Sequence, residues 1–420
     1  MQSRIPGRYI LIFTTFLLSL LLYIDRICIS TAKTPITNDL SLTDTQMGWV
    51  LSIFAVGYAL FQIPFGILAD KMGPRLILTF VVTLWSLFTG LTGLATTFVF
   101  LLFVRLLFGA GEAGAFPGIA RVIYTWIPMN ERGIVQGINF AGSRLGAAFA
   151  LPIIAWLIVT IGWRASFIFL MILGFAWAIV WFRWFRDTPE EHKKLHSNEI
   201  DYILKNRQLK NSIEKIPTIH FKKLFGSSNV WYLIVQYFCS NFTFFFCLTW
   251  LFSYIKETYS LTSLQASFCT AIPLLCGAFG NILSGWIVDY IYQLGYWTLS
   301  RRFPAIIGFA LAAIGLIGCA SADTIIFATI FLSIAIFGAD MTLCSSWSTC
   351  IDIGKKNAGA VSGTMNMAGN IGSFITALAF PYLHAWTHSA LPFFLAGALL
   401  NLLAVIMWFL IRPNLLIETN

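Results

Sequence analysis

Residues 46–75 read QMGWVLSIFAVGYALFQIPFGILADKMGPR, and this stretch decides the class of the protein. From 46 to 68 nearly every residue is apolar, and a helix needs about 20 such residues to span the hydrocarbon core of a bilayer. Charge returns at Asp70 and Lys71, where the run ends. An open strand in lipid would leave its backbone groups without hydrogen bonds, so the stretch predicts a transmembrane helix.

Runs of the same kind recur along the whole chain. A polar stretch at residues 187–227 separates six runs before it from six runs after it. We therefore expect an all-α membrane protein with 12 transmembrane helices in two related bundles, residues 1–186 and 228–420, joined by a loop at 187–227. The expected spans are 9–31, 46–68, 76–96, 98–124, 134–160, 164–185, 228–255, 265–288, 303–321, 324–350, 357–382 and 390–411.

The composition supports the membrane class. Of the 420 residues, 58% are hydrophobic and only 11% are charged, whereas a soluble domain carries about 25% charged residues. A soluble enzyme is therefore disfavoured. A membrane-embedded enzyme is disfavoured because no catalytic constellation is visible, and a sensor because the stretch at 187–227 is too short for a signalling domain.

The basic residues predict the orientation. If both termini lie in the cytoplasm, 21 of the 27 lysine and arginine residues fall on that side and three on the other. The remaining three, Arg26, Arg105 and Arg144, lie within spans. Cytoplasmic loops carry such an excess, so the net charge of +9 needs no nucleic acid as a partner.

Two internal repeats relate the halves. Residues 66–70 read GILAD at the end of the second span, and residues 285–289 read GWIVD at the end of the eighth. The fifth and eleventh spans align at an offset of 226, which sets Arg144 opposite Asn370. Parallel six-span halves with a binding site at their interface are the plan of one large class of transporters. The matching identities are Gly133, Val135, Gly137 and Gly146 with Gly359, Val361, Gly363 and Gly372.

These motifs resemble a known family. GILADKMGPR at 66–75 is similar to the signature between spans 2 and 3 of the major facilitator superfamily. YIDR at 23–26, RLLFGAGEAGAFP at 105–117 and AGAVSGTMNMAGN at 358–370 resemble its anion:cation symporter branch. That branch includes bacterial sugar-acid, hexuronate and phthalate permeases and the sialin-type transporters. The resemblance implies a multi-pass protein of a bacterial inner membrane that imports a small organic anion with protons, without a cofactor, as a monomer.

The resemblance also implies roles for particular residues. Asp25 and Glu112 match the protonatable pair of the family. The residues that match its substrate-binding positions are Arg26, Arg105, Tyr23, Tyr58, Trp347, Asn366 and Asn370. The residues that match its gating and structural motif, with their counterparts in the second half, are Gly66, Asp70, Lys71, Gly73, Arg75, Gly285 and Asp289.

One position departs from the sugar-acid relatives. They carry a glutamine at about the position of Ser143, whereas here the neighbour is Arg144, a full charge. An ionisable group inside the membrane costs about 2.5–3.5 kcal/mol on insertion scales, so each one needs a reason. No acidic residue in the same span neutralises Arg144, and we therefore expect it to bind substrate. For Asp340, in the tenth span, coupling and helix packing both stay open.

The residues predict a mechanism and leave one rival within transport. Three arginines attract a carboxylate, while Asp25 and Glu112 take up protons that accompany it. A phosphate-ester exchanger of the same fold is the alternative. It is disfavoured because such exchangers place an arginine in each half, and no expected span of the second half carries one. No metal site is expected: His384 and His388 are spaced for one but lack a third ligand.

Overall fold

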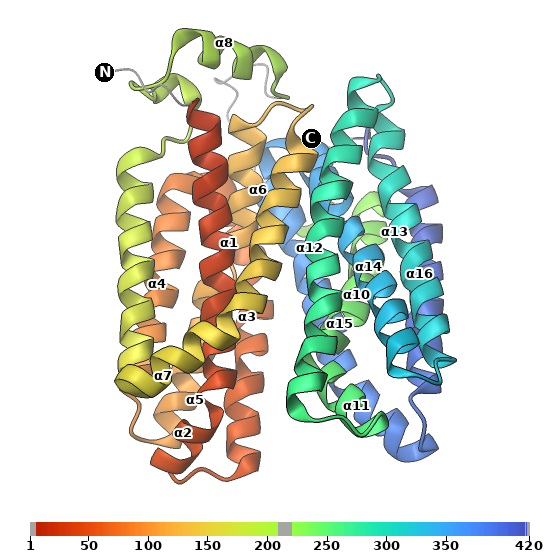
Figure 1. Ribbon diagram of the computed structural model, residues 1–420. Coiled ribbons are helices and arrows are strands. Elements are labelled where there is room, and N and C mark those ends of the chain that lie inside the picture. The colour runs from red at the N-terminus through yellow and green to blue at the C-terminus, as the bar shows by residue number, and fades with distance from the viewer. Residues whose placement is uncertain (1–5, 209–220, 416, 418–420) are drawn as a thin grey trace. The chain divides into compact units, whose positions relative to one another are not determined.

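The computed structural model describes residues 6–208, 221–415 and 417, and within these ranges it is almost entirely helical, without a strand (Figure 1). The helices are α1 (Gly7–Thr31), α2 (Lys33–Asp39), α3 (Asp44–Met72), α4 (Pro74–Gly93), α5 (Phe98–Glu112), α6 (Ala115–Trp126), α7 (Arg132–Trp184), α8 (Ser197–Asn206), α9 (Phe221–Leu224), α10 (Ser228–Thr249), α11 (Leu251–Thr258), α12 (Ser263–Gln293), α13 (Trp297–Ala320), α14 (Ile325–Gly354), α15 (Ala358–Thr387) and α16 (Leu391–Leu410). Short 3₁₀ turns lie at Pro189–Glu191 and Lys355–Asn357.

The expected membrane spans are confirmed. Among the described residues, 10 helical runs are long and apolar enough to cross a membrane. Two of these runs contain breaks. The helix α7 is 53 residues long and bends at Gly162, whose φ of 80° is not helical. The run Ile325–Thr387 contains α14, the turn Lys355–Asn357 and α15. Since α7 covers two expected spans and the run Ile325–Thr387 covers two more, all 12 have a helical counterpart.

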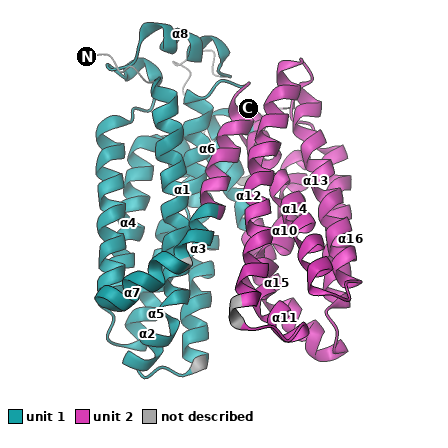
Figure 2. Cartoon of the chain, in the orientation of Figure 1, with its two compact units in different colours: residues 1–129, 145–219, 354–367 teal, residues 130–144, 220–353, 368–420 magenta. Residues whose placement is uncertain are grey.

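The chain forms two compact units, drawn in teal and magenta in Figure 2. Unit 1 comprises Met1–Met129, Leu145–Ile219 and Gly354–Met367. Unit 2 comprises Asn130–Arg144, His220–Ile353 and Ala368–Asn420. The first part of α7 therefore packs with unit 2, and the first part of α15 packs with unit 1. The expected domain boundaries at 186 and 228 stay a prediction.

The repeated G-x-x-x-D motif has one structural role in both units. In unit 1 the Asp70 carboxylate accepts hydrogen bonds from the backbone N–H groups of Gly359, at 2.9 Å, and Ala360, at 2.8 Å. In unit 2 the Asp289 carboxylate accepts from Gly133, at 2.8 Å, and Ile134, at 2.7 Å. Each aspartate thus accepts hydrogen bonds from backbone N–H groups in the first turn of a helix, which have no partner within that helix. Its negative charge also lies at the positive end of the helix dipole.

The glycines of the motif allow the helices to touch. A Cβ built on Gly285 would lie 2.5 Å from the carbonyl oxygen of Gly133, and one on Gly359 would lie 2.5 Å from that of Gly66. Backbone atoms cannot move aside easily, so both pairs of helices need glycine at the crossing.

This crossing predicts a specific loss of stability. Gly285→Ala is expected to destabilise the protein by about 1–3 kcal/mol, because the new methyl group overpacks the contact. The matched control is Gly48→Ala, since a Cβ on Gly48 meets nothing within 4 Å. Thermal unfolding of detergent-solubilised protein checks the difference. Equal melting temperatures of the two variants would contradict the close crossing.

The break between α5 and α6 places Glu112 at a helix end. Pro117 has no N–H to donate to the carbonyl of Ala113, four residues earlier, so the helical ladder is interrupted there. Gly114 fills the break, where a Cβ would lie 2.8 Å from the side chain of Val81. Glu112 is the last residue of α5 and is fully buried.

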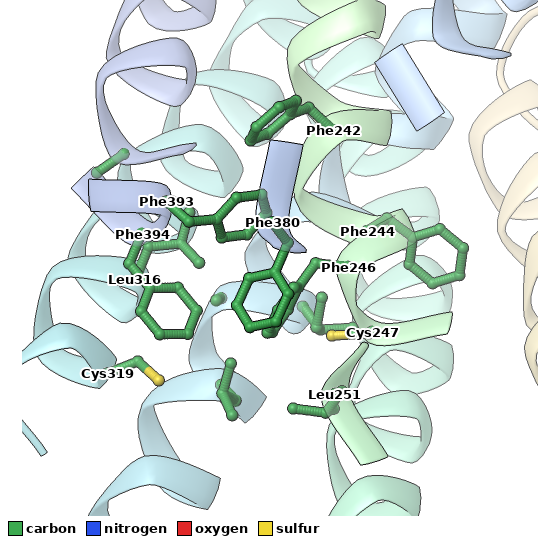
Figure 3. Packing of buried hydrophobic residues seen from close by; sticks show 14 of the residues in the cluster. Phe242, Phe244, Phe246, Cys247, Leu251, Leu316, Cys319, Phe380, Phe393 and Phe394 are labelled. Carbon is green, nitrogen blue, oxygen red and sulfur yellow. The ribbon is translucent and has the colours of Figure 1, made fainter. Parts of the chain in front are cut away.

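The apolar core of unit 2 is rich in phenylalanine (Figure 3). The rings of Phe246 and Phe380 lie 5.0 Å apart, and Phe246 also contacts Phe393 and Phe394. Phe244 lies two residues before Phe246 and therefore projects from a different side of α10, as Figure 3 shows. In that orientation the face of the Phe244 ring contacts a charged side chain, Arg144.

The expected connecting loop is partly folded. Within the described residues it contains Pro189–Glu191, α8 and α9, while residues 209–220 lie outside them. The Glu199 carboxylate of α8 accepts from the backbone of Gly7, at 2.8 Å, and Arg8, at 3.0 Å. It therefore caps α1, and Figure 1 shows α8 lying across that end of unit 1.

One of the two cations of the motif, Arg75, makes contacts within unit 1. The Arg75 side chain donates to the carbonyl of Phe182 at 2.9 Å and stacks over its ring. The backbone N–H of Arg75 donates to Asp187 at 2.8 Å, and burial raises the pKa of the Asp187 carboxyl above its ordinary value. Gly73 precedes this contact with a φ of 85°, which favours glycine. Lys71 is exposed.

The helix that carries the ninth expected span begins earlier than its apolar run. The helix α13 begins at Trp297 and not at 303, so Arg301 and Arg302 lie in its first turns. The helix starts early because Arg301 is fully buried and donates to Asp352 at 2.9 Å, which compensates its charge.

Candidate functional site

The centre of unit 1 contains a buried ion pair between two of the predicted residues. The Nε of Arg26 donates to both oxygens of Glu112, at 2.9 and 3.0 Å. Glu112 is fully buried and Arg26 is nearly so. The Nη2 atom of Arg26 is buried without a hydrogen-bond partner, so the guanidinium retains a donor after pairing with Glu112.

The neighbour of Arg26 on α1 has a neutral partner. The Oδ2 atom of Asp25 accepts from the indole Nε1 of Trp85 on α4 at 3.1 Å. Its Oδ1 atom is buried without a hydrogen-bond partner, and no salt bridge to Asp25 occurs in the described part of the chain. Burial of a carboxylate is costly unless the group is paired or carries a proton. Asp25 is therefore suited to proton exchange.

Arg105 is a buried cation without a carboxylate partner among the described residues. It is 2% exposed and its Nε atom has no hydrogen-bond partner. The guanidinium carbon instead lies 4.2 Å from the ring centre of Phe108 and 5.8 Å from that of Phe54. Stacking on aromatic faces holds the charge in place while its N–H donors remain available. This arrangement suits a group that binds an anion from solution.

Aromatic and amide groups complete this cluster. The Arg26 guanidinium lies 4.4 Å from the ring centre of Tyr58 and 5.2 Å from that of Tyr23. The Nδ2 atom of Asn366 donates to the Tyr58 hydroxyl at 3.3 Å. Asn366 reaches this position because the first part of α15 belongs to unit 1. Unit 1 thus brings together seven predicted residues: Tyr23, Asp25, Arg26, Tyr58, Arg105, Glu112 and Asn366.

Arg144 lies in unit 2 and has a counter-ion. Its Nε and Nη2 atoms donate to the two oxygens of Asp340, at 2.8 and 2.5 Å. The expectation that nothing neutralises Arg144 within its span overlooked this partner, because Asp340 comes from α14 and is 196 residues away in the sequence. The guanidinium also lies 3.4 Å from the ring centre of Phe244.

The other predicted substrate-binding residues of unit 2 lie on α14 and α15. The Trp347 indole donates to the Tyr237 hydroxyl at 3.0 Å, and its ring lies 5.5 Å from that of Phe140 on α7. Asn370 is partly buried. Its expected position opposite Arg144 stays a prediction.

A large cavity of unit 2 is separate from these charges. It measures about 710 Å³ and lies among α12, α13 and α14. Its lining is almost entirely apolar and includes none of the predicted site residues. Such a surface offers an anion no charged group and few hydrogen-bonding groups, so the cavity does not suit an anion. Among the described residues no group of three or more histidine, cysteine, aspartate or glutamate side chains could hold a metal ion.

Several contact residues escaped prediction. Trp85, Phe108 and Phe244 are ordinary apolar positions in a span, and nothing in their spacing marks them. A signal did exist for the partner of Arg144. Arg132 and Arg144 are as far apart in the sequence as Asp340 and Asp352, and this equal spacing indicates two contacts between the same helices.

Comparison with known proteins gives the family. The model of the Major Facilitator Superfamily matches residues 15–377. The proton:xylose symporter XylE, solved with a bromodeoxyglucose, has a TM-score of 0.72 to this chain at 16% identity, and the match covers 97% of this chain and 98% of that one. At this identity the likeness shows the fold alone.

Curated relatives are similar over nearly the whole chain. The probable sulfoacetate transporter SauU of Cupriavidus necator is 33% identical, covering 100% of this chain and 97% of the relative. The hexuronate transporter of Bacillus subtilis is 31% identical, covering 95% and 93%. A probable galactarate/D-glucarate transporter of Escherichia coli is 29% identical, covering 92% and 90%. All are transporters and not enzymes. The chain therefore belongs to the Major Facilitator Superfamily, among its permeases for sugar acids and other organic anions.

Proposed function

We propose that this permease imports a small organic anion together with protons by alternating access, across a bacterial inner membrane and as a monomer. The observation that carries the proposal is the charge arrangement of unit 1. The cluster described above contains the guanidinium groups of Arg26 and Arg105 and the carboxyl groups of Asp25 and Glu112, and among these four only Arg26 and Glu112 form a salt bridge with each other. The lone cation, Arg105, supplies the anion site, and the lone carboxyl group, Asp25, supplies a proton site.

The geometry supports a linked binding of anion and proton. An acid group that approaches Arg105 can also use the Nη2 donor of Arg26. Charge-assisted hydrogen bonds to the anion then weaken the hold of Arg26 on Glu112. A carboxylate that loses its cation inside the membrane is stabilised by a proton from the aqueous phase. Each bound anion therefore favours proton binding, and each proton favours the anion.

The relatives supply the substrate panel. Their names give sulfoacetate, galactarate, glucarate and hexuronates, which are all small acids with a carboxylate or sulfonate group. We propose that the substrate of this permease belongs to this class. The three oxygens of a sulfonate and the two of a carboxylate both suit the planar donor pattern of arginine.

A transport screen tests the proposal. Purified protein in proteoliposomes is loaded with each acid of the panel, and counterflow of the labelled acid is measured with and without an inward proton gradient. We expect exchange of at least one acid, and accumulation of that acid when the outside is more acidic. The proposal would be contradicted if no acid of the panel were exchanged. Accumulation that does not depend on the proton gradient would contradict it as well.

The orientation is a separate prediction. We expect both termini and the connecting segment on the cytoplasmic side, because that side then carries most of the basic residues. A single cysteine at position 205, on α8, should be labelled by an impermeant maleimide only in inside-out vesicles, in a background without the eight native cysteines. Labelling of this cysteine in intact cells would contradict the predicted topology.

A further inference from the structure

Two buried ion pairs join the first part of α7 to α14 within unit 2. Arg132 donates to Asp352 at 2.5 Å, and Arg144 donates to Asp340 at 2.5 and 2.8 Å. The numbers rise along α7 as they fall along α14, so the two helices run antiparallel. The pairs are separated by about 18 Å along each helix. All four side chains are at most 4% exposed.

The two pairs differ in their charge balance. Asp352 faces two guanidinium groups, because Arg301 also donates to it at 2.9 Å, and the Trp297 indole donates to it at 3.0 Å. Asp352 would therefore keep a counter-ion if Arg132 moved away. Both oxygens of Asp340, in contrast, accept from the single guanidinium of Arg144, and no second cation reaches them in the described part of the chain.

The surroundings of Asp340 offer no replacement for that cation. The titratable groups around it are Arg144 from α7, the thiol of Cys247 from α10 and the thiol of Cys344 on α14 itself. From α12 the residue that packs against it is Gly277. Arg144 differs in this respect, because the face of Phe244 continues to stabilise its charge when Asp340 is lost.

From this asymmetry we infer that Arg144 and Asp340 form a second coupling site, at which an acid group of the substrate takes the place of Asp340 on Arg144 and Asp340 takes up a proton. The proton comes from the aqueous phase and joins a carboxylate oxygen, and it leaves when the anion leaves. The inference rests on the proposed function and adds Asp340 to its ion-coupling residues. The Arg132–Asp352 pair then has a structural role, because the Asp352 carboxylate keeps a cation partner throughout the transport cycle.

The test compares the two aspartates in proteoliposomes, with sulfoacetate or galactarate as the probe, whichever the wild type accumulates. Asp340→Asn keeps the shape of the side chain and cannot exchange a proton. We expect it to retain anion exchange and to move one proton fewer per anion than the wild type. The matched variant Asp352→Asn should lower the melting temperature and leave the proton-to-anion ratio unchanged. A wild-type ratio in folded Asp340→Asn would overturn the inference.

If Asp340→Asn does not fold, a double variant in which the two charged residues are swapped provides a second test. The double variant Arg144→Asp with Asp340→Arg restores an ion pair between the same helices. A coupling role predicts that this protein folds and loses anion transport, because the cation no longer stacks on Phe244. Folding together with wild-type transport and ratio would show a merely structural pair. Failure of the wild type to accumulate any acid would instead count against the proposed function itself.

Discussion

Glu112→Gln is expected to abolish the uphill, proton-driven accumulation of the anion, while exchange of anion for anion remains. Glutamine fits the same space beside Arg26 but cannot bind and release a proton. Exchange survives because it does not require the proton to leave. Asp25→Asn should have the same effect, since its carboxyl group accepts a hydrogen bond from the neutral indole of Trp85 and forms no salt bridge with the described residues. The measurement is uptake into proteoliposomes against a concentration gradient, with counterflow measured in parallel.

A surface carboxylate provides the matched control for this prediction. Asp39 forms an ion pair with Arg164 at 2.9 Å, but both side chains are substantially exposed, at 46% and 38%. An exposed pair contributes at most about 1 kcal/mol, so Asp39→Asn should leave accumulation and exchange unchanged. Normal proton-driven uptake in both Glu112→Gln and Asp25→Asn would end the proposed symport mechanism.

Arg105→Gln is expected to remove transport of the anion almost completely without unfolding the protein. Loss of Arg26 or Arg144 would leave a buried carboxylate without its salt bridge, because these arginines pair with Glu112 and Asp340. Arg105, in contrast, forms no salt bridge with a carboxylate among the described residues. Arg105→Lys keeps the charge and loses the planar fork. It should raise the apparent KM more than tenfold, because a charge-assisted hydrogen bond contributes about 1.5–3 kcal/mol.

Concentration-dependent uptake and melting temperature together check the role of Arg105. The binding role predicts a changed KM with an unchanged melting temperature in both variants. A structural role predicts that transport and melting temperature fall in parallel. A well-folded Arg105→Gln with the wild-type KM would contradict the anion site in unit 1.

The fold was predictable because its main determinants are local. Each span is a continuous apolar run, and the bilayer fixes the length of the run. The motifs ending at Asp70 and Asp289 could be matched by their letters alone, and the structure gives them the same capping role. The exact helix ends were less predictable. The helix α13 begins before its apolar run because Asp352 compensates the charge of Arg301.

The candidate site was predictable only in part. Ionisable residues inside spans are conspicuous, since the membrane makes them costly. Their partners are not, because each pair joins helices that are distant in the sequence. Arg26 and Glu112 are 86 residues apart, and Arg144 and Asp340 are 196 apart. The sequence therefore identified Arg144 as a charge whose cost inside the membrane must be compensated. It did not identify Asp340 as the carboxylate that compensates this charge.

The most direct test of the central claim is a count of the protons that move with the anion. Proteoliposomes that contain wild-type protein and a trapped pH-sensitive dye receive a pulse of sulfoacetate or galactarate, with no initial pH difference. The account predicts that the interior acidifies, that the rate saturates with the anion concentration, and that Glu112→Gln removes the signal. Anion entry at the wild-type rate without any acidification of the interior would contradict it.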